Sequence, residues 1–463
     1  MTDLEFEHLH RPDGWASPGR LTIGEDGLVT AIHESEPPGW SPVERIAGFA
    51  VPGMPNLHSH AFQRALAGRT EHRRGHDDRT DNLWTWRAEM YRFVARLGPD
   101  DLEAIAALAY LELVKGGFTS VGEFHYLHRD PDGARYADPA EMTWALVSAA
   151  RDVGLPITVL PVLYRHAGPG RPADPEQARF VLEVDEVVEV AIRVRAVGGG
   201  QVWSGIAPHS LRAVEPVELR ELRASWRAAG GGPVHVHVAE RPEEVAEIEA
   251  AHGLPPLRLL AETVGLDADW TLVHATHGEP DEHRAVASSG ATVALCPMTE
   301  ATVADGLFPL VRFGDAGGRW GIGTDSHYTT DVATELRMLE LGQRLLEGRR
   351  NPLVKESGGS AVHAGRVLFD VALSAGAASL GQPVGALAPG VRADLVVLDQ
   401  NATVLAGHGP ATVLDAWILT GGGATLVRDV MIGGRWIVRD GRHRLEDDIV
   451  ERYRRTAGRL AGA

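Results

Sequence analysis

The chain has 463 residues, of which 44% are hydrophobic and 23% are charged, a composition typical of a globular protein with a sizeable core. A formal net charge of -18 argues against a nucleic-acid-binding surface, although a local pair of arginines can still bind a small anion. Cys296 is the single cysteine, which excludes an intrachain disulfide and a cysteine-rich zinc site.

The start of the chain shows no pattern for export. Its first residues are acidic and lack the basic and apolar regions of a signal peptide, and no run in the sequence approaches the length of a membrane span. We therefore expect a cytoplasmic protein with no membrane or nucleic-acid partner.

Residues 1–50 are predicted to form short strands. Segments 20–23 and 28–32 flank a Gly-Glu-Asp-Gly sequence that favours a hairpin turn. His8 and His10 have the spacing of a metal-ligand pair, but they lie near a terminus among acidic residues, so no metal site is expected there.

Eight short apolar runs after residue 48 indicate buried strands. They alternate with segments of helical periodicity, predicted at 100–115, 216–229, 243–252, 255–264 and 280–289. Continuously apolar strands that alternate with helices are typical of a parallel sheet covered on both faces. Eight such repeats predict an α/β fold with a (β/α)8 TIM-type barrel over residues 51–380. The predicted strands are 49–58, 120–124, 157–163, 202–207, 234–238, 271–274, 292–296 and 320–323.

The segment 381–463 returns to a β pattern. Strands are predicted at 393–399, 416–419, 424–427 and 435–438, separated by glycine turns, and a helix is predicted at 448–463. Because residues 1–50 and 381–463 are each small for a separate core, we expect them to form one small β-sandwich domain beside the barrel.

Candidate metal ligands lie at the ends of several predicted strands. Alternate residues of a strand face the same side, so His58 and His60 can direct two imidazoles at one point. Active sites of (β/α)8 barrels lie at the carboxyl ends of the strands, where His237, His274 and Asp325 also fall. Imidazole and carboxylate groups are ligands of zinc and related ions. The alternative is a set of unrelated core histidines.

The sequence Pro-Gly-Met-Pro-Asn-Leu-His-Ser-His at residues 52–60 resembles the first-strand signature of the amidohydrolase superfamily. The longer segment 55–65, with Trp-Thr-Trp-Arg at 84–87 and Pro-His-Ser-Leu-Arg at 208–212, is similar to the N-formimino-L-glutamate deiminases of bacterial histidine degradation. This resemblance covers nearly the whole chain. It implies one divalent metal ion, usually zinc, and suggests a homodimer. The metal ligands it implies are His58, His60, His237 and Asp325, and the substrate contacts it adds are Gln63, Tyr126 and His209.

Lysine is scarce, and this bears on the number of metal ions. Many members of the superfamily hold two metals bridged by a carbamylated lysine at the end of the fourth strand. Here that strand ends in Ala-Pro-His-Ser, while Lys115 lies on a predicted helix and Lys355 lies beyond the eighth strand. We therefore expect one metal ion per chain.

The reaction that this resemblance implies is hydrolysis of N-formimino-L-glutamate to N-formyl-L-glutamate and ammonia. A divalent metal can lower the pKa of bound water to about 7, which makes hydroxide available to attack the formimino carbon. Asp325 is the expected base, Glu240 the relay that protonates the leaving nitrogen, and His274 the group that stabilises charge in the intermediate. The substrate is a small dicarboxylate, and Arg87 and Arg212 are the candidates for binding its two carboxylates.

Three other functions remain open. A mononuclear deaminase of a purine, a pterin or an adenosine derivative would keep the metal site, but would need stacking surfaces more than two arginines. A non-catalytic scaffold would be expected to lose metal ligands, and all four are present. A binuclear hydrolase of cyclic amides would need the missing lysine. Close analogues such as formiminoaspartate are not separated from formiminoglutamate by the sequence.

Overall fold

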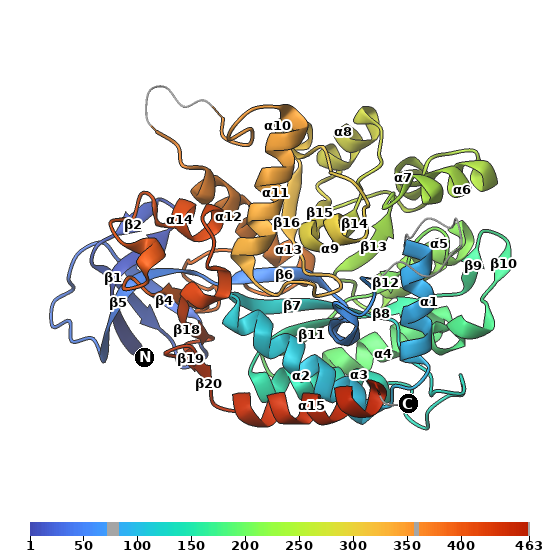
Figure 1. Ribbon diagram of the computed structural model, residues 1–463, viewed down its shortest axis with the longest axis horizontal. Coiled ribbons are helices and arrows are strands. Elements are labelled where there is room, and N and C mark those ends of the chain that lie inside the picture. Colours follow the sequence, from blue (N-terminus) through green and yellow to red (C-terminus); the bar gives the residue numbers. More distant parts are fainter. Residues whose placement is uncertain (72–82, 356–360, 462–463) are drawn as a thin grey trace.

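The computed structural model describes residues 1–71, 83–355 and 361–461 (Figure 1). In these ranges the chain forms one mixed sheet of nine strands, two parallel sheets of five and four strands, and a two-stranded ribbon. The mixed sheet contains β1 (Thr2–Arg11), β2 (Gly14–Ala16), β3 (Gly19–Ile23), β4 (Val29–His33), β5 (Glu44–Pro52), β17 (Leu395–Leu398), β18 (Val427–Ile432), β19 (Arg435–Arg439) and β20 (Arg442–His443).

Both ends of the chain build the mixed sheet. Its strand order is β20-β19-β18-β17-β5-β1-β3-β4, so β17 lies beside β5, and β3 and β4 form the predicted antiparallel hairpin. Figure 1 shows the blue and red strands together at one end of the molecule. All nine strands are hydrogen-bonded into one sheet rather than into the two layers of a sandwich.

This sheet curls so that the β3–β4 turn reaches the residues before β17 and the β18–β19 turn. The backbone N–H of Ala393 donates to Gly27 O, and the N–H of Gly434 donates to Ala393 O. A Cβ at Gly27 would lie 2.6 Å from Gly433 O, so the close approach requires glycine there. The curled sheet encloses an apolar cluster of its own, which includes Phe6 and Leu395.

The two parallel sheets carry the eight strands predicted for the barrel. Their orders are β11-β8-β7-β6, with β12 on β8, and β13-β14-β15-β16. Isolated parallel bridges join the sheets along both edges, between Ser59 and Asp325, Ile206 and Val234, and Ser210 and His237. The strands are β6 (Met54–Ser59), β7 (Phe118–His125), β8 (Ile157–Leu163), β11 (Val202–Ser204), β12 (Ala207–Pro208), β13 (Val234–Val238), β14 (Trp270–His274), β15 (Thr292–Leu295) and β16 (Arg319–Ile322).

The first predicted strand, 49–58, is in fact two strands. β5 ends at Pro52 in the mixed sheet, and β6 begins at Met54 in a parallel sheet. Gly53 lies between them, where a Cβ would approach the Thr119 side chain to 2.2 Å. An apolar pattern continues across this junction because both strands are buried, so the pattern alone could not show the change of sheet.

Helices cover the parallel sheets, and the five predicted from the sequence are confirmed within two residues. Several begin with proline and end at a glycine of positive φ, such as Gly253 after α6 and Gly290 after α8. The helices are α1 (Leu83–Val94), α2 (Pro99–Lys115), α3 (Glu141–Val153), α4 (Val184–Val197), α5 (Pro216–Ala228), α6 (Pro242–His252), α7 (Pro256–Val264), α8 (Pro280–Ser289), α9 (Pro297–Thr302), α10 (Leu310–Asp315), α11 (Val332–Glu347), α12 (Ala364–Ser374), α13 (Gly376–Leu380), α14 (Val413–Leu419) and α15 (Glu446–Ala461). The shorter elements are η1 (Ala61–Leu66), η2 (Pro175–Phe180), η3 (Thr403–Leu405), η4 (Gly423–Leu426), β9 (His166–Gly168) and β10 (Arg171–Pro172).

Two predicted strands near the C-terminus are wrong. Residues 416–419 lie in α14, and residues 424–426 lie in η4 just before β18. α14 is short and buries most of its side chains, including Trp417 and Ile418. A short helix that is buried on most sides has the same apolar pattern as a buried strand, and this explains the error. The predicted C-terminal helix is confirmed as α15, which packs along α2.

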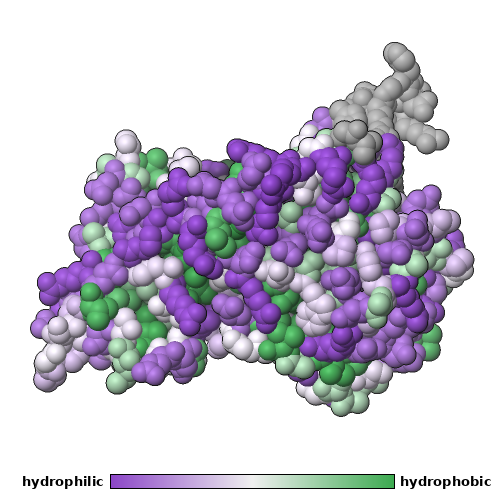
Figure 2. All heavy atoms as spheres, turned by 90° about the horizontal axis from the view of Figure 1, so that it is seen from below, coloured by the Kyte–Doolittle hydropathy of each residue, from purple (hydrophilic) through white to green (hydrophobic). Residues whose placement is uncertain are grey.

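The surface is largely hydrophilic on the face shown in Figure 2, where hydrophobic side chains form small separated groups. Among the described residues, no helix combines the length and the apolar character needed to cross a membrane.

Candidate metal centre and active site

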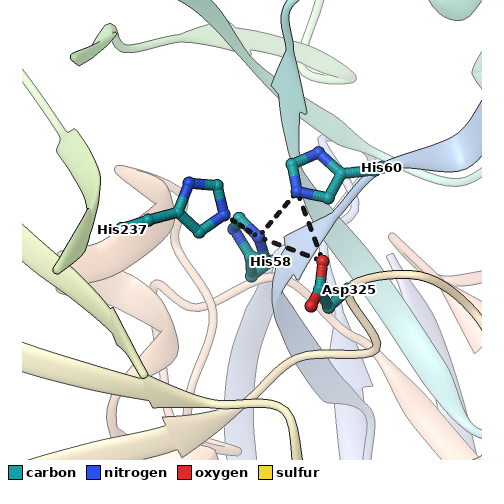
Figure 3. Close-up of side chains that lie close together, drawn as sticks. All are labelled: His58, His60, His237 and Asp325. Carbon is teal, nitrogen blue, oxygen red and sulfur yellow. Dashed lines mark hydrogen bonds and ion pairs between the residues drawn. The ribbon is translucent and has the colours of Figure 1, made fainter. Parts of the chain in front are cut away.

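Four side chains from three parts of the chain meet at one edge of the parallel sheets. His58 lies on β6, His60 directly follows it, His237 lies on β13, and Asp325 follows β16. Each offers one ligand atom, and these atoms all lie within 4.8 Å of one another (Figure 3). His58 Nε2 is 3.1 Å from both His60 Nε2 and His237 Nε2, and His60 Nε2 is 3.2 Å from Asp325 Oδ1. The structure therefore brings together the four residues predicted as ligands.

Two of these rings have their protons placed by backbone carbonyls. His60 Nδ1 is 2.9 Å from Phe124 O, and His237 Nδ1 is 3.0 Å from His209 O. A carbonyl oxygen only accepts, so each Nδ1 carries the proton and each Nε2 turns its lone pair to the centre of the cluster. Hydrogen bonds of this kind commonly orient metal-binding histidines.

The charge state of the cluster also suits a cation. Burial and the neighbouring histidines hold the pKa of His58 and His60 well below the usual range, and burial lowers the pKa of His237 to about 4. The three rings are therefore neutral and offer lone pairs. Three imidazole nitrogens and one carboxylate oxygen are a donor set that fits a divalent ion such as zinc.

Glu240 and His274 lie beside the cluster, Glu240 just after β13 and His274 as the last residue of β14. His274 Nε2 is 3.9 Å from both Glu240 Oε1 and Asp325 Oδ2. Burial would lower the pKa of His274, but the carboxylates of Glu240, Glu300 and Asp325 raise it to about 10. Burial would raise the pKa of Glu240, but the charge of His274 lowers it below its ordinary value. Near neutral pH the two groups therefore form an imidazolium–carboxylate pair.

A cavity opens onto this cluster, and four of the five residues predicted to bind substrate line it. Gln63, Arg87, Tyr126 and His209 line it together with His60, His237, Glu240, His274 and Asp325. Gln63 Nε2 donates to the Tyr126 hydroxyl at 2.7 Å. Arg87 Nη2 donates to the hydroxyls of Tyr91 and Tyr164 at 2.6 and 2.9 Å, which fixes its guanidinium at the cavity wall.

Arg212 is the exception, because it is absent from the residues that line the cavity. Its Nε donates to the carboxylate of Glu247 on α6, and its Nη2 donates to Ala167 O at 3.1 Å. The sequence placed Arg212 correctly after a strand end but gave no information on this competing carboxylate.

The cavity also contains residues that were not predicted. Ser326 directly follows Asp325, and its hydroxyl donates to Gln63 Oε1 at 2.5 Å, so adjacency to a ligand could have identified it. Tyr164 directly follows β8 and could have been found by its position at a strand end. Trp86 lies in the segment 84–87 that carries the family resemblance, which could have identified it. The remaining unpredicted lining residues come from α1, η2 and the α9 region, where the sequence gave no signal: Met90, Phe180, Thr299 and Val303.

Neither lysine lies near the cluster. Lys115 on α2 forms an ion pair with Glu446, and Lys355 lies 3.3 Å from Asp315. Since these are the only lysines of the chain, no lysine occupies the position expected for a bridge between two metals.

Comparison with known proteins agrees with this geometry. The model of the amidohydrolase family matches residues 49–437. The chain belongs to the amidohydrolase family. This amidohydrolase is 46% identical to formimidoylglutamate deiminase of Pseudomonas aeruginosa, over 99% of this chain and 100% of that protein. It is thus an enzyme of the hydrolase class.

Two solved structures resemble this amidohydrolase over its whole length. An amidohydrolase from Brucella melitensis has a TM-score of 0.91 and 37% identity, and the match covers 100% of both chains. An adenosine deaminase from Xanthomonas campestris with bound zinc has a TM-score of 0.80 and 20% identity, over 100% of this chain and 99% of that chain. The second likeness concerns the fold alone.

Proposed function

We propose that this amidohydrolase hydrolyses N-formimino-L-glutamate to N-formyl-L-glutamate and ammonia, as a step of histidine degradation. The observation that carries this proposal is a single cavity that joins the His58, His60, His237 and Asp325 cluster to the guanidinium of Arg87. The relative from Pseudomonas aeruginosa, named for a deiminase of formimidoylglutamate, supports the same substrate.

One divalent ion, zinc, is the proposed cofactor. His58, His60, His237 and Asp325 would hold it, and when bound it would supply Lewis-acid activation of water near neutral pH. The absence of a lysine near the cluster supports one ion rather than two.

The side chains around the cluster can move the protons that the reaction needs. Water adds to the formimino carbon and its proton passes to Asp325, which lies at the cluster. His274, held as an imidazolium, donates towards the negative charge that develops in the tetrahedral intermediate. Glu240 carries a proton to the nitrogen that leaves as ammonia, and the C–N bond to that nitrogen breaks as the formyl C=O bond forms.

The carboxylates of the substrate are proposed to bind at the cavity wall beside the cluster. Arg87 offers a charged fork fixed by Tyr91 and Tyr164, and Gln63, Tyr126 and His209 offer neutral hydrogen-bonding groups. Burial keeps the pKa of His209 well below the usual range, so its ring is neutral. Arg212 would take part by exchanging the carboxylate of Glu247 for that of the substrate.

We also propose that residues 51–380 form a closed (β/α)8 barrel, flanked by a small β domain made from residues 1–50 and 381–463. The parallel bridges at Ser59–Asp325 and Ile206–Val234, which join both edges of the two sheets, support closure. A barrel would bring all the strand ends that carry the site to one face.

Ammonia release by the zinc-loaded protein tests the proposal. N-formimino-L-glutamate, N-formimino-L-aspartate, guanine and an adenosine derivative are compared at equal concentrations. We expect the highest kcat/KM with formiminoglutamate. Activity confined to guanine or to the adenosine derivative would contradict the proposal and would favour a nucleobase deaminase.

A further inference from the structure

A buried carboxylate lies directly behind His274, on the side away from the cavity. Glu300 belongs to α9, and its Oε1 accepts hydrogen bonds from His274 Nδ1 at 3.1 Å and from the backbone N–H of Cys296 at 2.9 Å. Only 5% of Glu300 is exposed, and it is not among the residues that line the cavity. Glu300 therefore has no direct access to substrate, and any effect on the reaction must pass through a neighbour.

The position of the His274 ring needs such a neighbour. His274 and Ala275 both have positive φ, at 67° and 52°, so the chain leaves the regular geometry of β14 at this residue. The strand therefore does not fix the direction of the ring. Because Nδ1 is directed at Glu300, Nε2 is left to face Glu240 and Asp325, at 3.9 Å from each.

We propose that Glu300 is a positioning residue for His274, which holds the Nδ1–H and thereby keeps Nε2–H directed at the reacting centre. This inference rests on the proposed role of His274. A carboxylate at Nδ1 also places negative charge behind the ring, which stabilises the imidazolium when Nε2 donates to developing negative charge. Nothing in the sequence marked Glu300, because it lies after β15 on a short helix that carries none of the predicted ligands.

A purely structural role is the competing explanation. The bond from Cys296 N–H to Glu300 closes the first turn of α9, and loss of that bond alone would lower stability without acting on His274. The two explanations differ in what a second substitution at His274 would do.

Glu335 provides a matched control. It is a fully buried carboxylate on α11 that accepts from the backbone N–H of Met298, also on α9, at 3.0 Å and from Thr329 Oγ1 at 2.6 Å. It does not line the cavity, and its hydrogen bonds to Met298 and Thr329 do not involve His274. Glu300→Gln and Glu335→Gln therefore both replace a buried carboxyl group beside α9 with an amide, but only the first changes the partner of His274.

The experiment measures kcat, KM and metal content for wild type, Glu300→Gln, Glu300→Ala and Glu335→Gln with N-formimino-L-glutamate. Substitution of residues that orient a functional histidine typically costs about 10- to 100-fold. We expect a fall in kcat of about 10-fold for Glu300→Gln, whose amide oxygen can still accept both bonds, and of about 100-fold for Glu300→Ala. KM, metal content and the kcat of Glu335→Gln should stay within about twofold of wild type.

A double substitution decides between the explanations. Residues that act as one unit have non-additive effects, so Glu300→Ala should cause no further loss of kcat in a His274→Ala background. A further loss as large as in the wild-type background would overturn the proposal, and so would equal falls in kcat for Glu300→Gln and Glu335→Gln.

A readout without substrate keeps this test separate from the proposed function. In protein with 15N-labelled histidine, we expect a downfield imidazole N–H resonance that is lost in His274→Ala, shifted in Glu300→Gln and unchanged in Glu335→Gln. An unchanged resonance in Glu300→Gln would contradict the positioning role. Absence of wild-type turnover of formiminoglutamate would instead contradict the proposed function.

Discussion

The cavity has two parts that are built in different ways. The floor is formed by the candidate metal ligands His58, His60, His237 and Asp325, and the wall by residues proposed to bind the substrate, such as Arg87. On the floor, the candidate metal ligands sit at strand ends, and carbonyl groups of neighbouring strands orient the rings of His60 and His237. On the wall, Arg87 comes from a helix and is held by tyrosine hydroxyls. Arg212 lies outside the cavity lining, on a turn, and is held by Glu247. Backbone partners orient these two rings independently of side-chain identity. The wall depends on contacts between side chains, so we expect the floor to determine the chemistry and the wall to determine the substrate.

The largest expected effect comes from breaking the floor. His237→Ala removes one of four ligands, and we expect kcat/KM to fall by at least about 1,000-fold together with loss of bound metal. Elemental analysis of the purified variant measures the metal. His235→Asn is the control on the same strand, because His235 bonds to Ser379 O rather than to the cluster, and it should retain metal. Full metal content in His237→Ala would show that the cluster is not the metal site.

The second-largest effect is expected from substitution of Arg87, which lies in the wall. Loss of a buried charge-assisted hydrogen bond costs up to about 3 kcal/mol, so Arg87→Ala should lower kcat/KM for formiminoglutamate about 100-fold with metal retained. Steady-state kinetics and elemental analysis on the same sample provide both values. Arg92→Ala, on the same helix but largely exposed, should behave as wild type. Unchanged kinetics for Arg87→Ala would remove the carboxylate-binding role from the wall.

Variants of Arg212 and Glu247 test whether Arg212 exchanges the carboxylate of Glu247 for that of the substrate. If Arg212 leaves Glu247 to bind substrate, Arg212→Ala should raise KM about 10-fold, and Glu247→Gln should lower KM because the competing carboxylate is neutral. Substrate titrations of both variants measure this. A fall in melting temperature with unchanged KM in both variants would assign the Arg212–Glu247 pair to stability alone.

The smallest expected effect concerns the junction of floor and wall. Ser326 follows Asp325 and donates to Gln63, whose amide in turn donates to Tyr126. A neutral hydrogen bond contributes about 1 kcal/mol, so Ser326→Ala should raise KM about fivefold with little change in kcat. Kinetics at saturating and at low substrate separate the two. A fall in kcat with unchanged KM would place Ser326 with the floor.

The floor was predictable from the sequence because strand periodicity determines it. His58 and His60 share a face through alternation, and a parallel arrangement brings His237 and Asp325 to the same edge without knowledge of any loop. The eight strands were located for the same reason, since buried parallel strands are continuously apolar.

The wall and the C-terminal segment were less predictable because tertiary partners determine them. Nothing in the sequence shows that Arg212 meets Glu247 or that Glu300 meets His274, since these pairs come from different elements. The α14 helix was mistaken for a strand because burial on nearly all sides removes its periodicity. The strands from the two ends of the chain were expected to form a sandwich. Only the hydrogen-bonded pairing of the strands shows that they form one curled sheet.

The most direct test of the central claim is which C–N bond breaks. Wild-type protein loaded with zinc is incubated with N-formimino-L-glutamate in H2(18)O, and the products are analysed by mass spectrometry together with an ammonia assay. We predict one ammonia per turnover and N-formyl-L-glutamate with a single 18O in the formyl group. Formation of glutamate and formamide, or of no product at all, would contradict the account.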